Sequence, residues 1–140
     1  MEGELKNHVI VCGYGLVGER IVDTLLQYNV PVVVIEIDPK KVEIIRERCI
    51  DVIEGNATLS KILKEAGIAN AKAVAAVMDD DAKNLLVVIT AKSLNNNVTI
   101  ATRVNDELLK EKLGDAGANF IATPNKSASD ELFGELVKGL

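Results

Sequence analysis

Residues 9–18, VIVCGYGLVG, join an apolar run to three glycines spaced as GxGxxG. The first four residues are typical of a buried strand, and a helical pattern begins after Gly15. Gly13 would permit a tight turn, Gly15 omits a side chain that would block a pyrophosphate, and Gly18 lets the helix pack close to the strand. The first N–H groups of a helix in this position attract anions. The stretch therefore predicts a phosphate-binding turn between a strand and a helix.

A second apolar run, residues 32–36 (VVVIE), ends in an acid, Glu36. It lies about 20 residues after Gly15, the spacing of the acid that binds ribose hydroxyls in dinucleotide-binding units. A carboxylate there also repels the 2′-phosphate of NADP. No arginine follows Glu36, so the sequence favours NAD(H) over NADP(H). Asp38 is interpreted as the cap of a helix starting near Pro39 rather than as a second ligand.

Apolar runs and helical patterns alternate along the whole chain. The expected strands cover residues 8–12, 32–36, 51–54, 73–78, 98–102 and 119–122, and the expected helices 16–28, 39–49, 58–66, 82–94, 106–113 and 127–140. Val42, Ile45 and Cys49 are expected to face inward. This alternation predicts an α/β fold, a Rossmann-like doubly wound sheet of six parallel strands in the order 3-2-1-4-5-6. Residues 1–124 would form this nucleotide-binding domain, and residues 125–140 a connecting helix.

Length and composition fit one globular domain of 140 residues, with 48% hydrophobic residues and 3% aromatic residues. An acidic chain, with a net charge of −5 and no basic cluster, is a poor candidate for binding nucleic acid or anionic lipid. No run approaches the roughly 20 apolar residues of a membrane span. Cys12 and Cys49 form no CxxC pair, and Cys12 is expected to be a buried thiol. A reducing, cytoplasmic setting fits these features.

The chain offers little for catalysis. Its only histidine, His8, falls at the amino end of the first strand, whereas ligands of open α/β sheets bind at the carboxyl end. We therefore expect a surface histidine rather than a general base. Asp79, Asp80 and Asp81 could hold a divalent ion, but a solvated helix start is the favoured interpretation, and no metal site is predicted. The sequence thus predicts a binding domain that is not an enzyme, with a ligand that biases one conformation or assembly.

Several segments, in their order and spacing, resemble the RCK N-terminal domain, also called TrkA-N or KTN, which regulates potassium channels and transporters. These segments are VIVCGYGLVGERI, VVVIEIDPKKVE, VIEGNATLSKILKEAGI, AVAAVMDDDAKNLLVVITAK, IATRVND and LGDAGANFIATP. The resemblance implies a cytoplasmic gating domain at the inner face of the cell membrane. It also implies homodimers that build an octameric ring beneath a potassium channel pore or transporter subunit. The ligands it implies are NAD(H), ATP/ADP or, in some channels, calcium.

The resemblance carries over residue by residue. The three glycines and Glu36 match their family counterparts, and residues 55–58 (GNAT) match a GDAT segment near the adenosine, with Asn56 replacing the aspartate. Arg103 matches a basic residue that reaches phosphate. The motif and the resemblance together place these residues around the ligand: Gly13, Tyr14, Gly15, Leu16, Val17, Gly18, Glu36, Ile37, Asn56, Ala57, Thr58, Met78, Asp79 and Arg103.

Two departures from the family bear on the ligand. Some ATP-binding relatives carry a basic residue where this chain has Leu16, so a terminal phosphate would lack a charge-assisted partner here. NAD(H) is therefore favoured, with ATP/ADP as the rival. Calcium-gated relatives place glutamates after the fifth strand, where this chain has Thr102, Arg103 and Val104, so calcium is not expected.

The expected last helix carries an apolar stripe of Leu132, Phe133, Leu136, Val137 and Leu140. The family implies that this stripe crosses to a neighbouring subunit and makes a dimer, and the alternative is that it folds back on its own sheet. Two other functions stay open. One is the cofactor-binding half of an NAD-dependent oxidoreductase, and the other is a degenerate scaffold that mediates assembly only.

Overall fold

A six-stranded parallel sheet forms the centre of the computed structural model, which describes residues 5–123 and residue 136. The strands pair in the order β3-β2-β1-β4-β5-β6, and every pair is parallel. This confirms the predicted Rossmann-like doubly wound fold and its strand order. The strands are β1 (Val9–Cys12), β2 (Val32–Glu36), β3 (Asp51–Glu54), β4 (Ala73–Ala76), β5 (Thr99–Arg103) and β6 (Phe120–Ala122).

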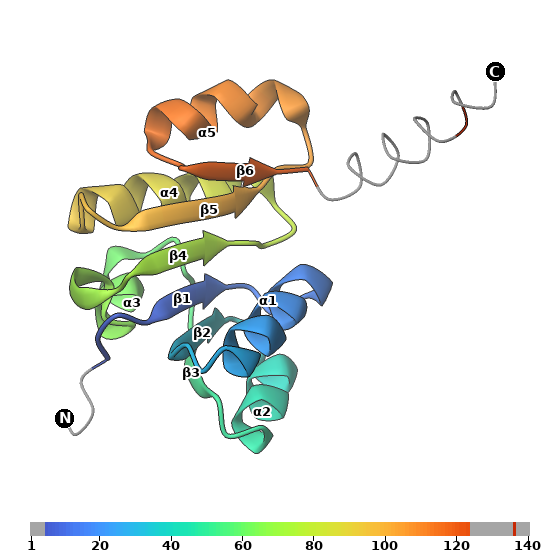
Figure 1. The fold of residues 1–140 in the computed structure, drawn as a ribbon, viewed down its shortest axis with the longest axis vertical. Helices are drawn as coiled ribbons and strands as arrows, with labels where there is room; N and C mark the ends of the chain where they lie inside the picture. The colour runs from blue at the N-terminus through green and yellow to red at the C-terminus, as the bar shows by residue number, and fades with distance from the viewer. Residues whose placement is uncertain (1–4, 124–135, 137–140) are drawn as a thin grey trace.

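Helices cover both faces of the sheet (Figure 1). On one face, α1 (Leu16–Gln27) and α2 (Pro39–Glu47) pack over β1, β2 and β3. On the other face lie α3 (Ser60–Glu65), α4 (Asp81–Leu94) and α5 (Lys110–Ala116). Short 3-10 turns, η1 (Ile68–Asn70) and η2 (Glu107–Leu109), precede β4 and α5. Because all strands run the same way, the loops after β1, β2, β4 and β5 meet at one edge of the sheet.

Most element boundaries lie within two residues of those expected, and side-chain hydrogen bonds accompany two of the differences. The strand expected to reach Met78 ends at Ala76, because the Asn84 side chain bonds both the N–H and the carbonyl of Met78. The helix expected over 106–113 is instead η2 followed by α5. The Asp106 carboxylate accepts the N–H of Leu108 and starts the tighter turn.

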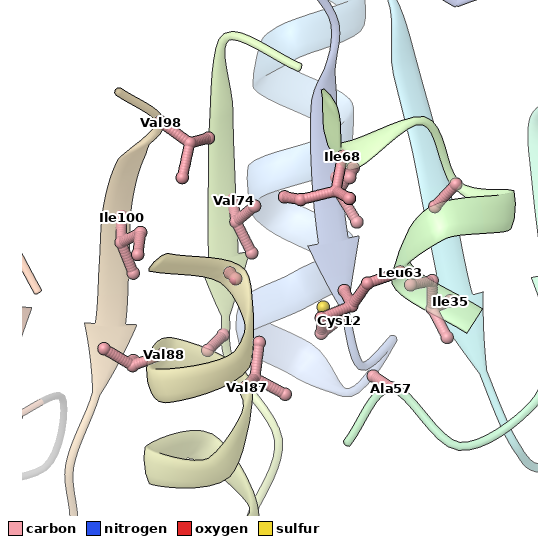
Figure 2. Close-up of a cluster of buried hydrophobic side chains, with 14 of the residues drawn as sticks. Cys12, Ile35, Ala57, Leu63, Ile68, Val74, Val87, Val88, Val98 and Ile100 are labelled. Carbon is pink, nitrogen blue, oxygen red and sulfur yellow. The ribbon is translucent and has the colours of Figure 1, made fainter. Parts of the chain in front are cut away.

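The core consists of two apolar layers, one on each side of the sheet. The larger layer packs α3 and α4 against alternate residues of the strands, and Figure 2 shows Cys12, Val74 and Ile100 facing Val87 and Val88 in this layer. Cys12 is fully buried, as predicted, and burial raises the pKa of its thiol to about 12. Among the described residues, this layer contains no large aromatic side chain, as a composition dominated by Val, Ile, Leu and Ala leads us to expect.

Two predicted side-chain positions were wrong. Cys49 does not face inward, because α2 ends at Glu47 and Cys49 is an exposed residue with a left-handed φ of 60°, so that Ile50 enters the core instead. His8 is not on the surface but fully buried, with its Nε2 2.7 Å from the carbonyl oxygen of Ala66. It does lie at the amino end of β1, away from the glycine turn.

The two thiols should therefore differ in reactivity. Iodoacetamide at pH 8 should alkylate Cys49 rapidly and leave Cys12 unmodified, because alkylation requires an accessible thiolate and Cys12 offers none. Mass spectrometry should find one label on the folded chain and two labels after denaturation in urea. Rapid double labelling of the folded chain would contradict the buried position of Cys12.

The prediction for the last segment lies mostly outside the described residues. Of the expected apolar stripe only Leu136 is described, and the Leu136 residue is 72% exposed. The division into residues 1–124 and 125–140 stays a prediction. Among residues 5–123 and 136, none of the helices has the length and apolar character needed to cross a membrane.

Candidate functional site

The glycine turn after β1 is tightly packed on one side and open on the other. Gly13 has a φ of 104°, and a Cβ on it would lie 3.2 Å from the Cα of Met78. A Cβ on Gly18 would lie 2.0 Å from the carbonyl oxygen of Gly13, so the first turn of α1 rests directly on the glycine turn. Gly15 is the N-cap of α1, and a Cβ on it would meet no atom within 4 Å. The open side thus exposes the start of α1, where the first N–H groups have no intrahelical acceptor.

Glu36 ties this turn to the end of β2. One carboxylate oxygen accepts the N–H of Tyr14 at 2.8 Å, and the other accepts the N–H groups of Ile37 and Asp38 at 2.9 Å each. The side chain is buried. A carboxylate has about four acceptor positions, so about one remains for a ribose hydroxyl. Asp38 caps α2 by accepting the N–H of Lys40, as predicted.

A residue that the sequence did not single out, Arg48, fixes the other side of the glycine turn. Its guanidinium donates to the hydroxyl of Tyr14 and lies 2.7 Å from the carboxylate of Asp23 on α1. The Tyr14 ring is buried under α1 and α2. The turn is thus fixed by the bond from the Tyr14 N–H to Glu36 and by the bond from Arg48 to the Tyr14 hydroxyl.

The carboxyl ends of β4 and β5 are joined through the first turn of α4. The buried Asn84 accepts the N–H of Met78 and donates to the carbonyls of Met78 and Arg103. Asp81 accepts the N–H groups of Asn105 and Asp106, both at 2.8 Å. Asp80 caps α4 by accepting the N–H of Lys83. Asp80 and Asp81 therefore have structural partners, and no group of three metal-ligating side chains occurs among residues 5–123 and 136.

Arg103 lies at this corner, and not all of its N–H donors have partners among the described residues. Its Nη2 donates to the side-chain oxygen of Asn105 at 2.8 Å and lies 3.6 Å from Asp79, whose side chain is 93% exposed. Its Nε is buried and finds no hydrogen-bond partner among the described residues. Buried N–H groups rarely stay unpaired, so this atom is an exception among the described residues.

A cavity of about 290 Å³ runs along the carboxyl edge of the sheet from the end of β2 to the end of β5. Ten of the predicted site residues line it: Gly13, Tyr14, Gly15, Glu36, Ile37, Asn56, Ala57, Met78, Asp79 and Arg103. Leu16, Val17, Gly18 and Thr58 do not line it. Thr58 instead donates through its N–H and hydroxyl to the side-chain oxygen of Asn56. As ligand contacts, all of these residues stay predictions.

Sequence reasoning missed two cations at the cavity, Lys41 on α2 and Lys83 on α4. It also missed Ile35, Val77 and Asp80 as lining residues, and Gly55 was assigned only as part of the GNAT segment. Helix periodicity places Lys41 and Lys83 in the first turns of helices that follow the strands. That position is the signal that they lie near the carboxyl edge.

The fold, the open helix start and the cavity at the carboxyl edge define a Rossmann-type domain of the class that binds nucleotides. The family model of the TrkA-N domain matches residues 9–124, so the chain belongs to the TrkA-N family. The resemblance found in the sequence is thereby confirmed.

Curated relatives include potassium channel and potassium uptake proteins. The chain is 37% identical over 123 residues to potassium channel protein 1 of Methanocaldococcus jannaschii, covering 86% of this chain and 37% of that protein. It is 31% identical over 136 residues to a Trk system potassium uptake protein TrkA homolog of Pyrococcus horikoshii, covering 93% and 60%. The chain thus spans less than two thirds of either relative.

Solved structures share the fold. The TrkA-N domain of the inner membrane protein ybaL from Escherichia coli superposes with a TM-score of 0.90 at 26% identity, over 95% of this chain and 98% of that one. The GsuK channel bound to NAD superposes with a TM-score of 0.79 at 22% identity, over 87% of this chain and 22% of that one. GsuK was also solved bound to ADP, with a TM-score of 0.78 at 22% identity over 87% and 32%.

Proposed function

We propose that this chain is the cytoplasmic ligand-sensing domain of a potassium channel or potassium transporter, and that it binds NAD(H) to control potassium conductance. The single observation that carries the proposal is the preformed glycine turn, open over Gly15 and closed around Gly13 and Gly18, in a TrkA-N domain with channel and transporter relatives.

The ligand would lie along the cavity with its adenosine at the β2 end. Glu36 would accept a ribose hydroxyl, and Asn56 and Ala57 would border the adenine. The pyrophosphate would take the N–H groups at the start of α1, which has no side-chain cap. NAD(H) is the first candidate because Leu16 brings no charge to a terminal phosphate, and ATP/ADP is the rival.

A regulatory role, rather than an enzymatic one, is supported by where the titratable groups lie. His8 is at the opposite edge of the sheet and is bonded to the carbonyl of Ala66. None of the cavity residues pairs a nucleophile with a general base in the way acyl- or hydride-transfer sites require. The oxidoreductase alternative needs a base from outside the described residues, so a catalytic domain encoded downstream in the parent gene would favour it.

Assembly is supported by an uncovered part of the sheet. Ile121 packs into the larger core layer, so Phe120 and Ala122 face the opposite side, where Phe120 is 66% exposed. In the described part of the chain, no helix covers β6 on that side (Figure 1). We infer that the apolar stripe containing Leu136 covers this face in a homodimer, the unit of an octameric gating ring.

Titration calorimetry with NADH, NAD, ATP and ADP tests the proposal. We expect saturable binding of NADH or NAD with a dissociation constant below that of ATP, because Leu16 offers no charged partner to a terminal phosphate. Sedimentation velocity with and without the tightest ligand should then show a change in the oligomer, as a ligand-biased assembly requires. No heat with any of the four nucleotides would contradict the ligand assignment and leave the fold intact.

A further inference from the structure

The side-chain amide of Asn56, in the loop after β3, is held in one orientation. Its Oδ1 accepts the N–H of Thr58 at 3.0 Å and the hydroxyl of Thr58 at 2.7 Å. A backbone N–H can only donate, so the amide oxygen, and not the amide nitrogen, must face Thr58. The Nδ2 group of Asn56 therefore lies on the side of the amide that is turned away from Thr58.

This loop lies beside the end of β2. The N–H of Gly55 bonds the carbonyl of Glu36 at 3.0 Å, and Gly55, Asn56 and Ala57 all line the cavity. Glu36 is the residue proposed to bind a ribose hydroxyl, and the base of a nucleotide is joined directly to that ribose. Asn56 is therefore placed to contact the base.

The amide of Asn56 presents only hydrogen-bond donors to the cavity. The two bonds from Thr58 use both acceptor positions of Oδ1. Nδ2 has no acceptor among residues 5–123 and 136. It is also absent from the buried atoms that lack a partner, and the residue is half-buried, so a ligand can reach its N–H groups.

The other polar side chains at this end of the cavity do not supply an acceptor for the base. Glu36 accepts three backbone N–H groups and keeps about one position, which the ribose would take. Lys41, which lines the cavity from α2, can only donate. The side chains here therefore match a base that carries hydrogen-bond acceptors.

Purine bases differ in what they offer at position 6. Adenine carries an amino group there, which donates, whereas hypoxanthine and guanine carry a carbonyl oxygen, which accepts. We propose that Asn56 is a specificity-determining residue, and that its Nδ2 group makes the site accept a 6-oxopurine at least as tightly as adenine. This inference rests on the proposed nucleotide-binding function and concerns the class of base that the site takes.

The test compares NAD with nicotinamide hypoxanthine dinucleotide by titration calorimetry on the whole chain, because the second ligand replaces the 6-amino group by a carbonyl. In the unaltered chain, the hypoxanthine form should bind as tightly as NAD or more tightly. Asn56→Asp has the same size, keeps one oxygen for Thr58 and turns the Nδ2 donor into an acceptor. It should shift the ratio of the two affinities about fivefold or more towards NAD.

The ratio separates base recognition from charge, because the new carboxylate would weaken both dinucleotides alike. The matched control is Asn96→Asp, which adds the same charge at an exposed residue in the turn before β5, at the opposite edge of the sheet, and should leave the ratio unchanged. Tighter binding of NAD by the unaltered chain, or an unchanged ratio in Asn56→Asp, would overturn the role of Asn56 and leave nucleotide binding in place. An unaltered chain that binds neither dinucleotide would overturn the proposed function itself.

Discussion

Replacing Gly15 by aspartate is expected to abolish nucleotide binding and leave the domain folded. A Cβ at Gly15 meets no atom within 4 Å, and its φ of −79° suits any residue, so the side chain has room. Aspartate is also a better N-cap than glycine by a few tenths of a kcal/mol. The melting temperature should therefore stay the same or rise slightly, as circular dichroism can measure.

The new carboxylate would occupy the place where we expect the pyrophosphate. The aspartate would repel the phosphates and would itself accept the free N–H groups at the start of α1. NADH binding should therefore weaken about 100-fold or more, roughly 2.8 kcal/mol. The control is Gly114→Asp, which adds the same charge in open space on α5, away from the cavity. NADH affinity within threefold of the unaltered chain for Gly15→Asp would show that the glycine turn is structural only, as in a scaffold that mediates assembly.

Much of the fold was predictable because strands and helices leave different apolar periods in the sequence. The runs that became β1 and β2 are continuous and apolar, as strands covered on both faces must be, and both are buried over their full length. Pro39 and Asp38 marked the start of α2 through fixed dihedral angles and capping. These are local rules, and they hold before any tertiary contact is known.

The failures concern side chains whose environment depends on distant residues. Nothing near His8 in the sequence indicates that the carbonyl of Ala66 will lie 2.7 Å from it. Cys49 fitted the helical period of α2, yet the helix ended two residues earlier, and a left-handed residue turned the thiol outward. Periodicity cannot show where such a helix stops, because no proline or glycine stands at that point.

In the candidate site, too, the features set by local sequence were predictable and the contacts between distant residues were not. The glycines and Glu36 were predictable from spacing alone, because the fingerprint describes a backbone turn and the strand end beside it. The contact of Arg48 with Tyr14 joins residues 34 positions apart and has no sequence signature. Lys41 and Lys83 were missed because exposed lysines in first helical turns are usually only solvated charges. Their place at the cavity becomes visible only in the three-dimensional structure.

Adding one methyl group at Gly18 should cost far more stability than adding one at Gly114. The Cβ of Gly18→Ala would lie 2.0 Å from the carbonyl oxygen of Gly13 and 3.0 Å from its carbonyl carbon. Both atoms belong to backbone, so no flexible side chain can move aside, and α1 or the glycine turn must shift. Overpacking of this kind costs about 1–3 kcal/mol, and contact with backbone puts the expected loss of stability at about 3 kcal/mol.

Gly114→Ala is the matched control, because its Cβ meets nothing within 4 Å and alanine is the better helix former inside α5. It should raise the free energy of unfolding by about 0.5–1 kcal/mol. Urea unfolding followed by far-ultraviolet circular dichroism measures both variants. We also expect Gly18→Ala to weaken NADH binding, since Gly13 shapes the turn. A Gly18→Ala chain as stable as the unaltered one would mean that α1 does not rest on the turn, and the glycine spacing would then lose its packing role.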